Sequence, residues 1–413
     1  MTHTYAMATG LILSSLAAVA QAEDEHICTN AAYSQVFHDR QAGANNKPDV
    51  VLDARASKLL NNDCHATVSA QAEGFYAAEK SSKAGKFPFL GRFPTQHKGD
   101  TTGHKSILQY VNSTITVPLG DAVTAVAQGE YSDVAYPGQN EYRLSQAWVI
   151  VGDRTKTPVY AAVGKGPTPF GDVPGYATIA RPATAHAFQV ESEDVQTMVG
   201  YNNGKTHVVA TAMTGKRQKR TAFGHNSDVL GNFAVNASQQ VSVTSDFSVR
   251  FGGGYLNDTI YDSSFPSHTA DSARQAEERG INGRHSPAWS AFAQATYKKV
   301  DVHVEHMRTF RAWQAGDHPV ITTAIQGRYR AKVLNKPAFV AVGTSVSTQG
   351  PNASKWHSFE QQNISVGMDI CPNVTLGVDY VHNNGFVPLI ALRQASARGV
   401  NADTVIAVGQ VRF

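Results

Sequence analysis

Thr404-Val-Ile-Ala-Val-Gly-Gln-Val-Arg-Phe413, the last ten residues of the chain, alternate between two kinds of side chain and end on phenylalanine. One face carries Val405, Ala407, Gly409 and Val411, and the other carries Thr404, Gln410 and Arg412. Successive side chains of a β-strand point to opposite sides, so this segment meets an apolar environment on one side and a wet one on the other. The pattern is typical of the closing strand of an outer-membrane β-barrel, although a secreted β-sandwich also has alternating strands.

The rest of the chain repeats this pattern in about 16 segments of roughly ten residues, which is the strand length of such barrels. We expect strands near residues 65–79, 104–117, 122–132, 141–151, 158–167, 194–202, 205–213, 226–238, 246–256, 286–297, 299–310, 318–332, 337–348, 357–370, 373–383 and 404–413. Short turns alternate with long connections near residues 80–103, 168–193, 214–225, 257–285 and 384–403. We therefore predict an all-β fold, a transmembrane antiparallel β-barrel of about 16 strands, with short periplasmic turns and long extracellular loops.

The composition and the amino terminus support export to the outer membrane of a bacterial cell. With 42% hydrophobic and 17% charged residues, the 413-residue chain is too polar for a helical membrane protein. Its long apolar stretch lies at the start, and Ala20-Gln-Ala22 fits a signal-peptidase site. We predict a signal peptide over residues 1–22, a periplasmic amino-terminal segment over 23–63 and the barrel over 64–413. Near-alternation in Val50–Ala56 suggests a short extra strand in that segment.

Three cysteines allow at most one internal disulfide in an exported protein. Cys28 and Cys64 are the favoured pair, because both precede or begin the first barrel strand, and Cys371 falls in a tight turn. The net charge of +3 comes without a basic stripe interleaved with aromatic residues, so we expect no nucleic-acid partner.

A barrel of about 16 strands encloses an aqueous channel, so its function depends on what narrows and charges the interior. The long connection after residue 167 is the candidate constriction loop, and it carries Asp172, Arg181, His186, Glu191 and Glu193. A loop that folds inward narrows the pore, whereas one that stays outside is a surface epitope. We favour the inward path.

Alternation also places charges on the lumen side of the wall. The acidic and histidine positions are Glu73, Glu130, Asp301, His303, Glu305 and Asp379, and the basic ones are Arg328, Arg330 and Arg412. Opposed signs would give a transverse field that orients polar solutes, and the alternative is a wet interior that tolerates any charge. An extracellular basic cluster, Lys216, Arg217, Lys219 and Arg220, would bind lipopolysaccharide phosphates, draw in an anionic solute or remain a solvated loop face.

Signals for an enzyme are weak, since neither a G-x-S-x-G elbow nor an H-E-x-x-H motif occurs. Ser290, Asp301 and His303 share the interior face of neighbouring strands, so a Ser/His/Asp arrangement stays open. His303 and Glu305 share a face that His306 does not, which argues against a metal site. We predict no catalytic residue, no metal and no cofactor. The partners we expect are outer-membrane lipids, lipopolysaccharide and a small solute, and oligomerisation stays possible.

Residues 146–171, Gln-Ala-Trp-Val-Ile-Val-Gly-Asp-Arg-Thr-Lys-Thr-Pro-Val-Tyr-Ala-Ala-Val-Gly-Lys-Gly-Pro-Thr-Pro-Phe-Gly, resemble the LbtU-like siderophore porins. In that family a short Gly-containing turn leads into a Pro-Val-Tyr strand that finishes on Pro-Phe-Gly. The resemblance extends from about residue 64 to the end and implies a porin-like receptor that imports a ferric siderophore without a TonB box or plug. The alternatives are a general anion-leaning diffusion porin and, from another class, a barrel enzyme such as a lipid hydrolase or a surface interaction protein.

Overall fold

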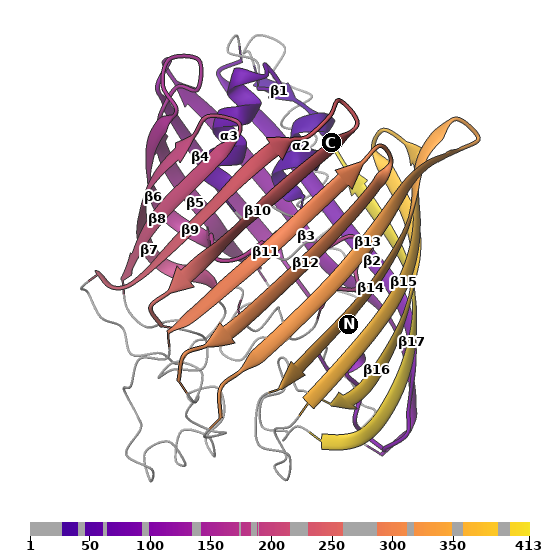
Figure 1. The fold of residues 1–413 in the computed structure, drawn as a ribbon. Helices are drawn as coiled ribbons and strands as arrows, with labels where there is room; N and C mark the ends of the chain where they lie inside the picture. The colour runs from indigo at the N-terminus through magenta and orange to yellow at the C-terminus, as the bar shows by residue number, and fades with distance from the viewer. Residues whose placement is uncertain are drawn as a thin grey trace.

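Sixteen antiparallel strands form a closed barrel in the computed structural model (Figure 1). The structure describes residues 27–39, 46–60, 64–92, 99–133, 142–172, 175–182, 188, 190–214, 230–258, 287–311, 318–348, 358–386 and 397–413. The barrel strands are β2 (Ala66–Ser81), β3 (Thr102–Leu119), β4 (Val123–Tyr131), β5 (Tyr142–Val151), β6 (Val159–Thr168), β7 (Val190–Asn202), β8 (Thr206–Thr214), β9 (Leu230–Ser242), β10 (Phe247–Leu256), β11 (Ala288–Tyr297), β12 (Val300–Thr309), β13 (Ile321–Val333), β14 (Lys336–Thr348), β15 (Ser358–Cys371), β16 (Val374–Phe386) and β17 (Ala397–Arg412). A 3-10 turn, η1 (Leu90–Arg92), follows β2.

Each barrel strand pairs with the next, and β17 closes the barrel by pairing antiparallel with β2, from Ala402 opposite Ser81 to Arg412 opposite Gln71. The first residues of β2 extend beyond the end of β17. There the short strand β1 (Ile27–Thr29) pairs parallel with them, placing Cys28 opposite Thr67. Because β1 takes the edge that the last strand leaves open, no unpaired stretch of β2 remains beside Phe413.

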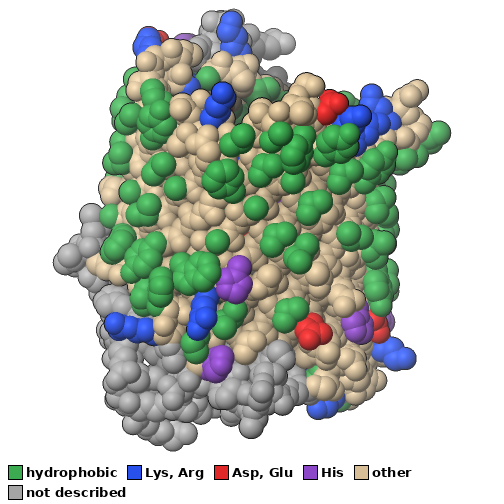
Figure 2. Space-filling model, in the orientation of Figure 1, with side chains coloured by type: hydrophobic (Ala, Val, Ile, Leu, Met, Phe, Trp, Pro, Cys, Tyr) green, Lys and Arg blue, Asp and Glu red, His purple; other side chains and the backbone are tan. Residues whose placement is uncertain are grey.

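The two faces of the wall differ as the alternation predicts. On β12, Val300, Val302 and Val304 are exposed on the outside, whereas Asp301, His303 and Glu305 are buried inside. Figure 2 shows apolar side chains spread over one side of the barrel, with charged residues toward its two ends. Tyr76, Tyr297, Tyr329 and Tyr380 are exposed on the outside, as expected for aromatic girdles at membrane interfaces. The prediction of a transmembrane β-barrel is confirmed.

The end of the barrel that carries the short turns is the periplasmic end. At the β13–β14 turn, Leu334 and Asn335 have positive φ of 51° and 62°. Positive φ at both central residues is the hairpin geometry that matches the twist of paired strands. The strand ends that flank the long connections lie at the opposite end, so successive hairpins keep the asymmetry expected from the sequence.

The amino-terminal segment (residues 27–39 and 46–60) lies inside the periplasmic end of the barrel. It contains two helices, α2 (Ala31–His38) and α3 (Lys47–Ala56), so the extra strand expected over Val50–Ala56 is wrong. The Asn46 side chain accepts a hydrogen bond from the Asp49 N–H, and Pro48 sits in the first turn. An asparagine cap followed by proline starts a helix, and these local effects outweigh the weak alternation. Among the described residues, no helix is long and apolar enough to cross a membrane.

An apolar core holds the helices of the amino-terminal segment against one side of the inner wall. Its helical members are Tyr33, Phe37, Val51, Leu52 and Ala54, and its wall members are Val126, Trp148, Ile150, Tyr160, Ala162, Met198 and Val209. Polar contacts surround this core: the Tyr33 hydroxyl lies 2.9 Å from Thr116 Oγ1, and Ser34 Oγ donates to the Ala70 carbonyl at 2.7 Å. The interior beside β3 to β8 is therefore filled at the periplasmic end.

Candidate functional site

A second segment, the lumen loop (residues 169–172 and 175–182), leaves the end of β6 and crosses the inside of the barrel. Gly171 has φ of +68°, and a Cβ there would meet the ends of the Glu305 and Met307 side chains, so any other residue would strain this turn. The backbone N–H of Asp172 donates to Glu305 Oε1 at 2.8 Å. The Asp172 carboxylate forms an ion pair with Arg250, and its Oδ2 lies 3.5 Å from His303 Nε2. Strands β10 and β12 therefore fix the start of the loop.

The middle of the lumen loop is fixed by an aromatic residue. The Tyr176 N–H donates to Gln326 Oε1 at 3.3 Å, and the Arg328 guanidinium lies 4.6 Å from the centre of the Tyr176 ring. Burial raises the pKa of Tyr176 to about 12, so its hydroxyl is neutral at physiological pH. A neutral ring under a guanidinium is the geometry of a cation–π contact.

Two buried carboxylates on the wall hold loop backbones inside the barrel. Asp379 on β16 accepts the N–H groups of Ile179 and Ala180 at 2.8 Å each, and also the Thr178 hydroxyl. In the same way, Glu79 on β2 accepts the N–H groups of Phe89 and Leu90 at 3.0 and 2.7 Å. Hydrogen bonds to an ionised acceptor are stronger than neutral ones. Both loops also share an apolar cluster that includes Phe89, Leu90, Ile179 and Ile406.

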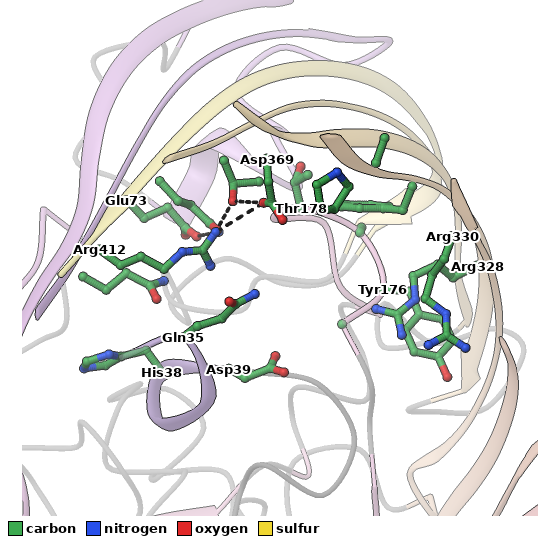
Figure 3. A pocket seen from close by; sticks show the side chains of 18 of the residues that line it. Gln35, His38, Asp39, Glu73, Tyr176, Thr178, Arg328, Arg330, Asp369 and Arg412 are labelled. Carbon is green, nitrogen blue, oxygen red and sulfur yellow. Dashed lines mark hydrogen bonds and ion pairs between the residues drawn. The ribbon is translucent and has the colours of Figure 1, made fainter. Parts of the chain in front are cut away.

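A polar cavity of about 340 Å³ lies between the amino-terminal segment, the lumen loop and the wall. Figure 3 shows its residues, with Gln35, His38 and Asp39 from α2 and its end, Tyr176 and Thr178 from the loop, and Arg328, Arg330, Asp369 and Arg412 from the wall. The residues from β13, β15 and β17 lie near the periplasmic turns, so the cavity occupies the periplasmic half of the barrel. A smaller cavity of about 50 Å³ lies beside Asp172, Arg250 and His207.

Some of the lumen charges predicted from the sequence form ion pairs with each other or with a neighbouring strand, and others accept hydrogen bonds from neutral groups. Asp301 accepts from Arg328 at 2.9 and 3.1 Å and from Arg330 at 3.1 Å. Arg143 lies 2.9 Å from Glu130, and Glu73 accepts from the Tyr110 hydroxyl at 2.9 Å. Charge is therefore balanced locally at Asp301 and at Glu130, and the transverse field across the whole barrel stays a prediction.

The candidate loop residues have different locations. Asp172 and Arg181 belong to the lumen loop, and Arg181 lines the cavity. Glu191 and Glu193 fall within β7, because that strand begins at Val190, before the loop was expected to end. His186, the signal peptide and the basic cluster Lys216, Arg217, Lys219 and Arg220 lie outside the described residues. Cys28 and Cys64 form a disulfide with Cα atoms 5.9 Å apart, and Cys371 is exposed.

The residues considered for catalysis do not assemble. Ser290 pairs with Met307, whereas His303 pairs with Gln294, four residues away along the same strand. Four residues of a strand span about 13 Å, well beyond hydrogen-bond reach. The Asp301 carboxylate is bound to Arg328 and Arg330. His306 lies on the outer face beside Trp289, and no group of three potential metal ligands occurs among the described residues.

Several residues of this site were not among those predicted from the sequence. Gln35 and Asp39 were not predicted because the helix α2 was not predicted. The signal for that helix is Asn30, whose side chain caps it by accepting a hydrogen bond from the Tyr33 N–H. Tyr176 lies in a loop without periodicity. Glu79 and Arg250 carry an alternation signal, since both fall on the polar face of their strands. The loop partner of Arg250, Asp172, lies 78 residues earlier, and the partners of Glu79, Phe89 and Leu90, lie in a connection without periodicity.

No protein family model matches the sequence, and no curated protein is significantly similar to it. Solved structures share its fold. OprB of Pseudomonas putida has 12% identity and a TM-score of 0.57, with 87% of this chain and 97% of that one covered. OmpF of Salmonella typhi, in complex with daunomycin, has 11% identity and a TM-score of 0.53, covering 84% and 97%. An anion-selective porin from Comamonas acidovorans has 10% identity and a TM-score of 0.51, covering 84% and 99%. At this identity the similarity shows the fold, which is that of outer-membrane porins.

Proposed function

We propose that the protein is a porin-like channel of the bacterial outer membrane for small polar solutes. The observation that carries this proposal is the polar cavity of about 340 Å³ inside a closed barrel whose outer wall is apolar. Hydrocarbon surrounds the wall, and each polar row would be costly there. The same rows are cheap against water, so a hydrated path through the interior follows from the distribution of side chains.

The lumen loop and the amino-terminal segment make this path narrow. Together they restrict passage to the side of the lumen lined by β13 to β17, β2 and β3, where the larger cavity lies. Small diffusing solutes must then contact Arg328, Arg330 or Arg412 on the wall. A pore narrowed in this way discriminates by size and by hydrogen bonding, as channels do at their constrictions.

Reconstitution of the purified protein into planar bilayers tests the proposal. Discrete conductance steps are expected, together with entry of labelled glycerol into proteoliposomes. The heat-unfolded protein, added at the same concentration, is the control and gives neither signal. If the folded protein also gives neither, it is not a channel.

Import of a ferric siderophore is the narrower proposal, and the resemblance of residues 146–171 supports it. Ligand pockets span roughly 300 to 1,000 Å³, and the cavity is at the lower end of that range. A siderophore must wrap the iron with six donor atoms, so the lumen loop has to move for it to pass. Block of the conductance by a ferric siderophore, stronger in the Asp379→Asn variant that loosens the loop, supports import. Loss of the gene without effect on siderophore-dependent growth contradicts it.

A general anion-leaning porin is the alternative, and the local pairing of the lumen charges does not favour it. A reversal potential close to zero in a salt gradient is expected from balanced charges. A potential that clearly favours anions and does not respond to siderophore supports the anion-leaning alternative. Contact of the outer wall with lipids and lipopolysaccharide is part of the proposed location.

A further inference from the structure

An arginine without a partner lies on the outer face of the barrel, near the end that carries the long connections. Arg308 on β12 is exposed, and it shares the outer face of that strand with Val300, Val302 and Val304. Among the residues that the structure describes, its guanidinium has no hydrogen bond and no ion pair. A charged side chain on the outer wall is costly at the middle of the membrane and cheap at its interfaces, so the level of Arg308 along the barrel decides what it meets.

The neighbouring strand β11 gives this level. Arg308 is directly opposite Trp289, and at the other end of the same strand pair Val300 is directly opposite Tyr297. Between these two rings the outer face of β11 carries alanine alone. Eight residues of a tilted strand rise about 20 Å along the barrel axis, close to the height of about 25 Å of the apolar band of such barrels. Trp289 and Tyr297 therefore mark the two interfaces, and Arg308 lies at the outer one, where the head groups of the outer-leaflet lipids begin.

Aromatic rings on β9 to β12 surround this position. Tyr255 on β10 is directly opposite Trp289, and the centre of its ring lies 5.7 Å from that of Phe233 and 6.1 Å from that of Phe310. Phe233 and Phe310 are 45% and 56% exposed. Figure 2 shows large apolar side chains together with histidine and basic side chains at this end of the barrel. Rings at an interface pack against the upper part of lipid chains and leave polar groups in contact with the head groups.

His306 adds a polar group on the same face, one row nearer to the hydrocarbon. Its Nδ1 lies 2.8 Å from Thr323 Oγ1, and the centre of its ring lies 5.2 Å from that of Trp289. His306 and Arg308 are two residues apart on one face of a strand, so their backbones are about 7 Å apart. Polar side chains at this depth are costly unless they have polar partners. A lipid head group held by Arg308 would provide one.

The absence of acidic neighbours distinguishes this side of the barrel from the side formed by β16, β17 and β2. The strands β9 to β14 contain two acidic residues, and both face inside. On the other side, at the same end of the barrel, Asp403 lies 2.8 Å from His382 Nδ1 and is directly opposite Lys80. An anionic head group is therefore attracted by Arg308, whereas beside Lys80 it also meets a carboxylate.

We propose that Arg308, with His306 and the surrounding aromatic rings, is a binding site for lipopolysaccharide, the phosphorylated glycolipid of the outer leaflet. The guanidinium receives a phosphate group of the lipid A part in its fork of N–H donors. Trp289, Tyr255 and Phe310 pack against the acyl chains and the sugar below that phosphate. The inference rests on the location proposed for the protein, the bacterial outer membrane, and it does not depend on which solute crosses the channel.

Native mass spectrometry of the folded full chain in detergent micelles, titrated with lipid A, tests the site. The probes are bisphosphorylated lipid A, the same lipid A after removal of its phosphates, and phosphatidylglycerol. Bisphosphorylated lipid A is expected to bind roughly tenfold more tightly than either of the others, as one charge-assisted contact to phosphate provides. Arg308→Gln should remove this preference, and Arg308→Lys should keep part of it, because it retains the charge and loses the fork.

Lys80→Gln is the matched control, because it removes one positive charge at the same end of the barrel, next to Asp403. It should leave the preference unchanged. A shift of gel mobility on heating identifies the variants that are folded barrels. If folded Arg308→Gln keeps the preference, or if the lipid A without phosphates binds as tightly to the unmodified chain, the site is wrong. If phosphatidylglycerol binds as tightly through Arg308, the assignment to lipopolysaccharide is wrong.

Conductance in planar bilayers separates this inference from the channel function. Arg308 lies on the outer face, so Arg308→Gln should conduct like the unmodified chain. Loss of the lipid preference with unchanged conductance is the expected result. A channel that conducts but shows no preference for the phosphorylated lipid contradicts the binding site alone.

Discussion

Two segments fill the lumen, and they are held there by different forces. The amino-terminal segment packs an apolar core against the wall and is tied by the Cys28–Cys64 disulfide. The lumen loop enters an apolar cluster through Ile179, but charged groups fix its start and its middle, with Asp172 on Arg250 and with backbone N–H groups on Asp379. An apolar core spreads its stabilisation over many contacts, whereas a carboxylate anchor concentrates it in one side chain. We infer that the first segment is a fixed wall of the pore and the second an adjustable one.

The largest expected effect comes from disrupting the apolar core of the amino-terminal segment. Leu52 is 2% exposed, and Leu52→Asp removes packing that contributes about 2–5 kcal/mol and adds a carboxylate to an apolar site. The segment should leave the wall, so the single-channel conductance should rise several-fold and trypsin should cleave after Arg55. Val36→Asp on α2 is the control, because Val36 is 40% exposed. An unchanged conductance in Leu52→Asp would mean that the segment does not narrow the path.

Removing the disulfide should have a somewhat smaller effect on the same segment. Cys28 and Cys64 are 36 residues apart, and chain entropy assigns about 4 kcal/mol to closing a loop of that size. The Cys28→Ser/Cys64→Ser variant should keep the barrel and lower the temperature at which trypsin reaches α2 and α3. The apolar core should still hold the segment at room temperature, with little change in conductance. Cys371→Ser is the control, because Cys371 is not in the disulfide. If it lowers the temperature of cleavage by trypsin as much, the effect does not come from the Cys28–Cys64 bond.

The adjustable wall should respond to a single isosteric substitution. Asp379→Asn keeps the shape but exchanges one acceptor oxygen for an N–H₂ group that faces N–H donors, which costs about 1–3 kcal/mol. Hydrogen exchange at Ile179 and Ala180 should accelerate by roughly 10- to 100-fold, with a noisier and larger conductance. Glu79→Gln is the matched variant, because it should accelerate exchange at Phe89 and Leu90 and leave Ile179 protected. Equal effects at both places would contradict separate anchors.

The difference between the two segments also explains what the sequence predicted. The 16 strands were predicted because each has water on one side and hydrocarbon on the other, a constraint that marks every second residue. The largest error lies in β17, which begins at Ala397 and not near residue 404. Its early residues include Gly399, with φ of +60°, and Arg398, which break the apolar alternation.

What fills the lumen is harder to predict from the sequence. Helices α2 and α3 bury their apolar sides against a curved wall, so no heptad repeat marks them, and only Asn30, Asn46 and Pro48 signal their starts. Asp379 was correctly placed on the inner face, but its partners lie about 200 residues earlier in a loop. Alternation identifies which side a residue faces, and it carries no information about which loop reaches that residue.

The smallest expected effect on the amino-terminal segment comes from the turn that carries Arg154, which contacts that segment. Arg154 forms ion pairs with Asp49 and Asp53 of α3, and the preceding residue, Asp153, shapes the turn. Hydrogen bonds from the Thr155 hydroxyl and then from its backbone N–H lower the pKa of Asp153 to about 2. Because this pKa lies below the ordinary value of 3.8, the stabilisation is complete above pH 3.8 and is lost as the pH falls through about 2.

The titration of the Asp153 carboxyl in detergent micelles, followed by carbon-13 NMR, should therefore have its midpoint near 2, and a midpoint near 3.8 would contradict the hydrogen bonds. Asp153→Asn should change the trypsin sensitivity of α3 by less than about twofold at neutral pH, since the turn is exposed. Lys156 Nζ pairs with Asp121 at 3.0 Å and with Asp153 at 3.1 Å. Asp121→Asn removes the first ion pair alone, so it separates the ion pairing of Lys156 from the hydrogen bonds that Asp153 accepts from Thr155. If Asp153→Asn releases α3 as strongly as Leu52→Asp does, the amino-terminal segment is held by its charges, and the contrast between a fixed and an adjustable wall fails.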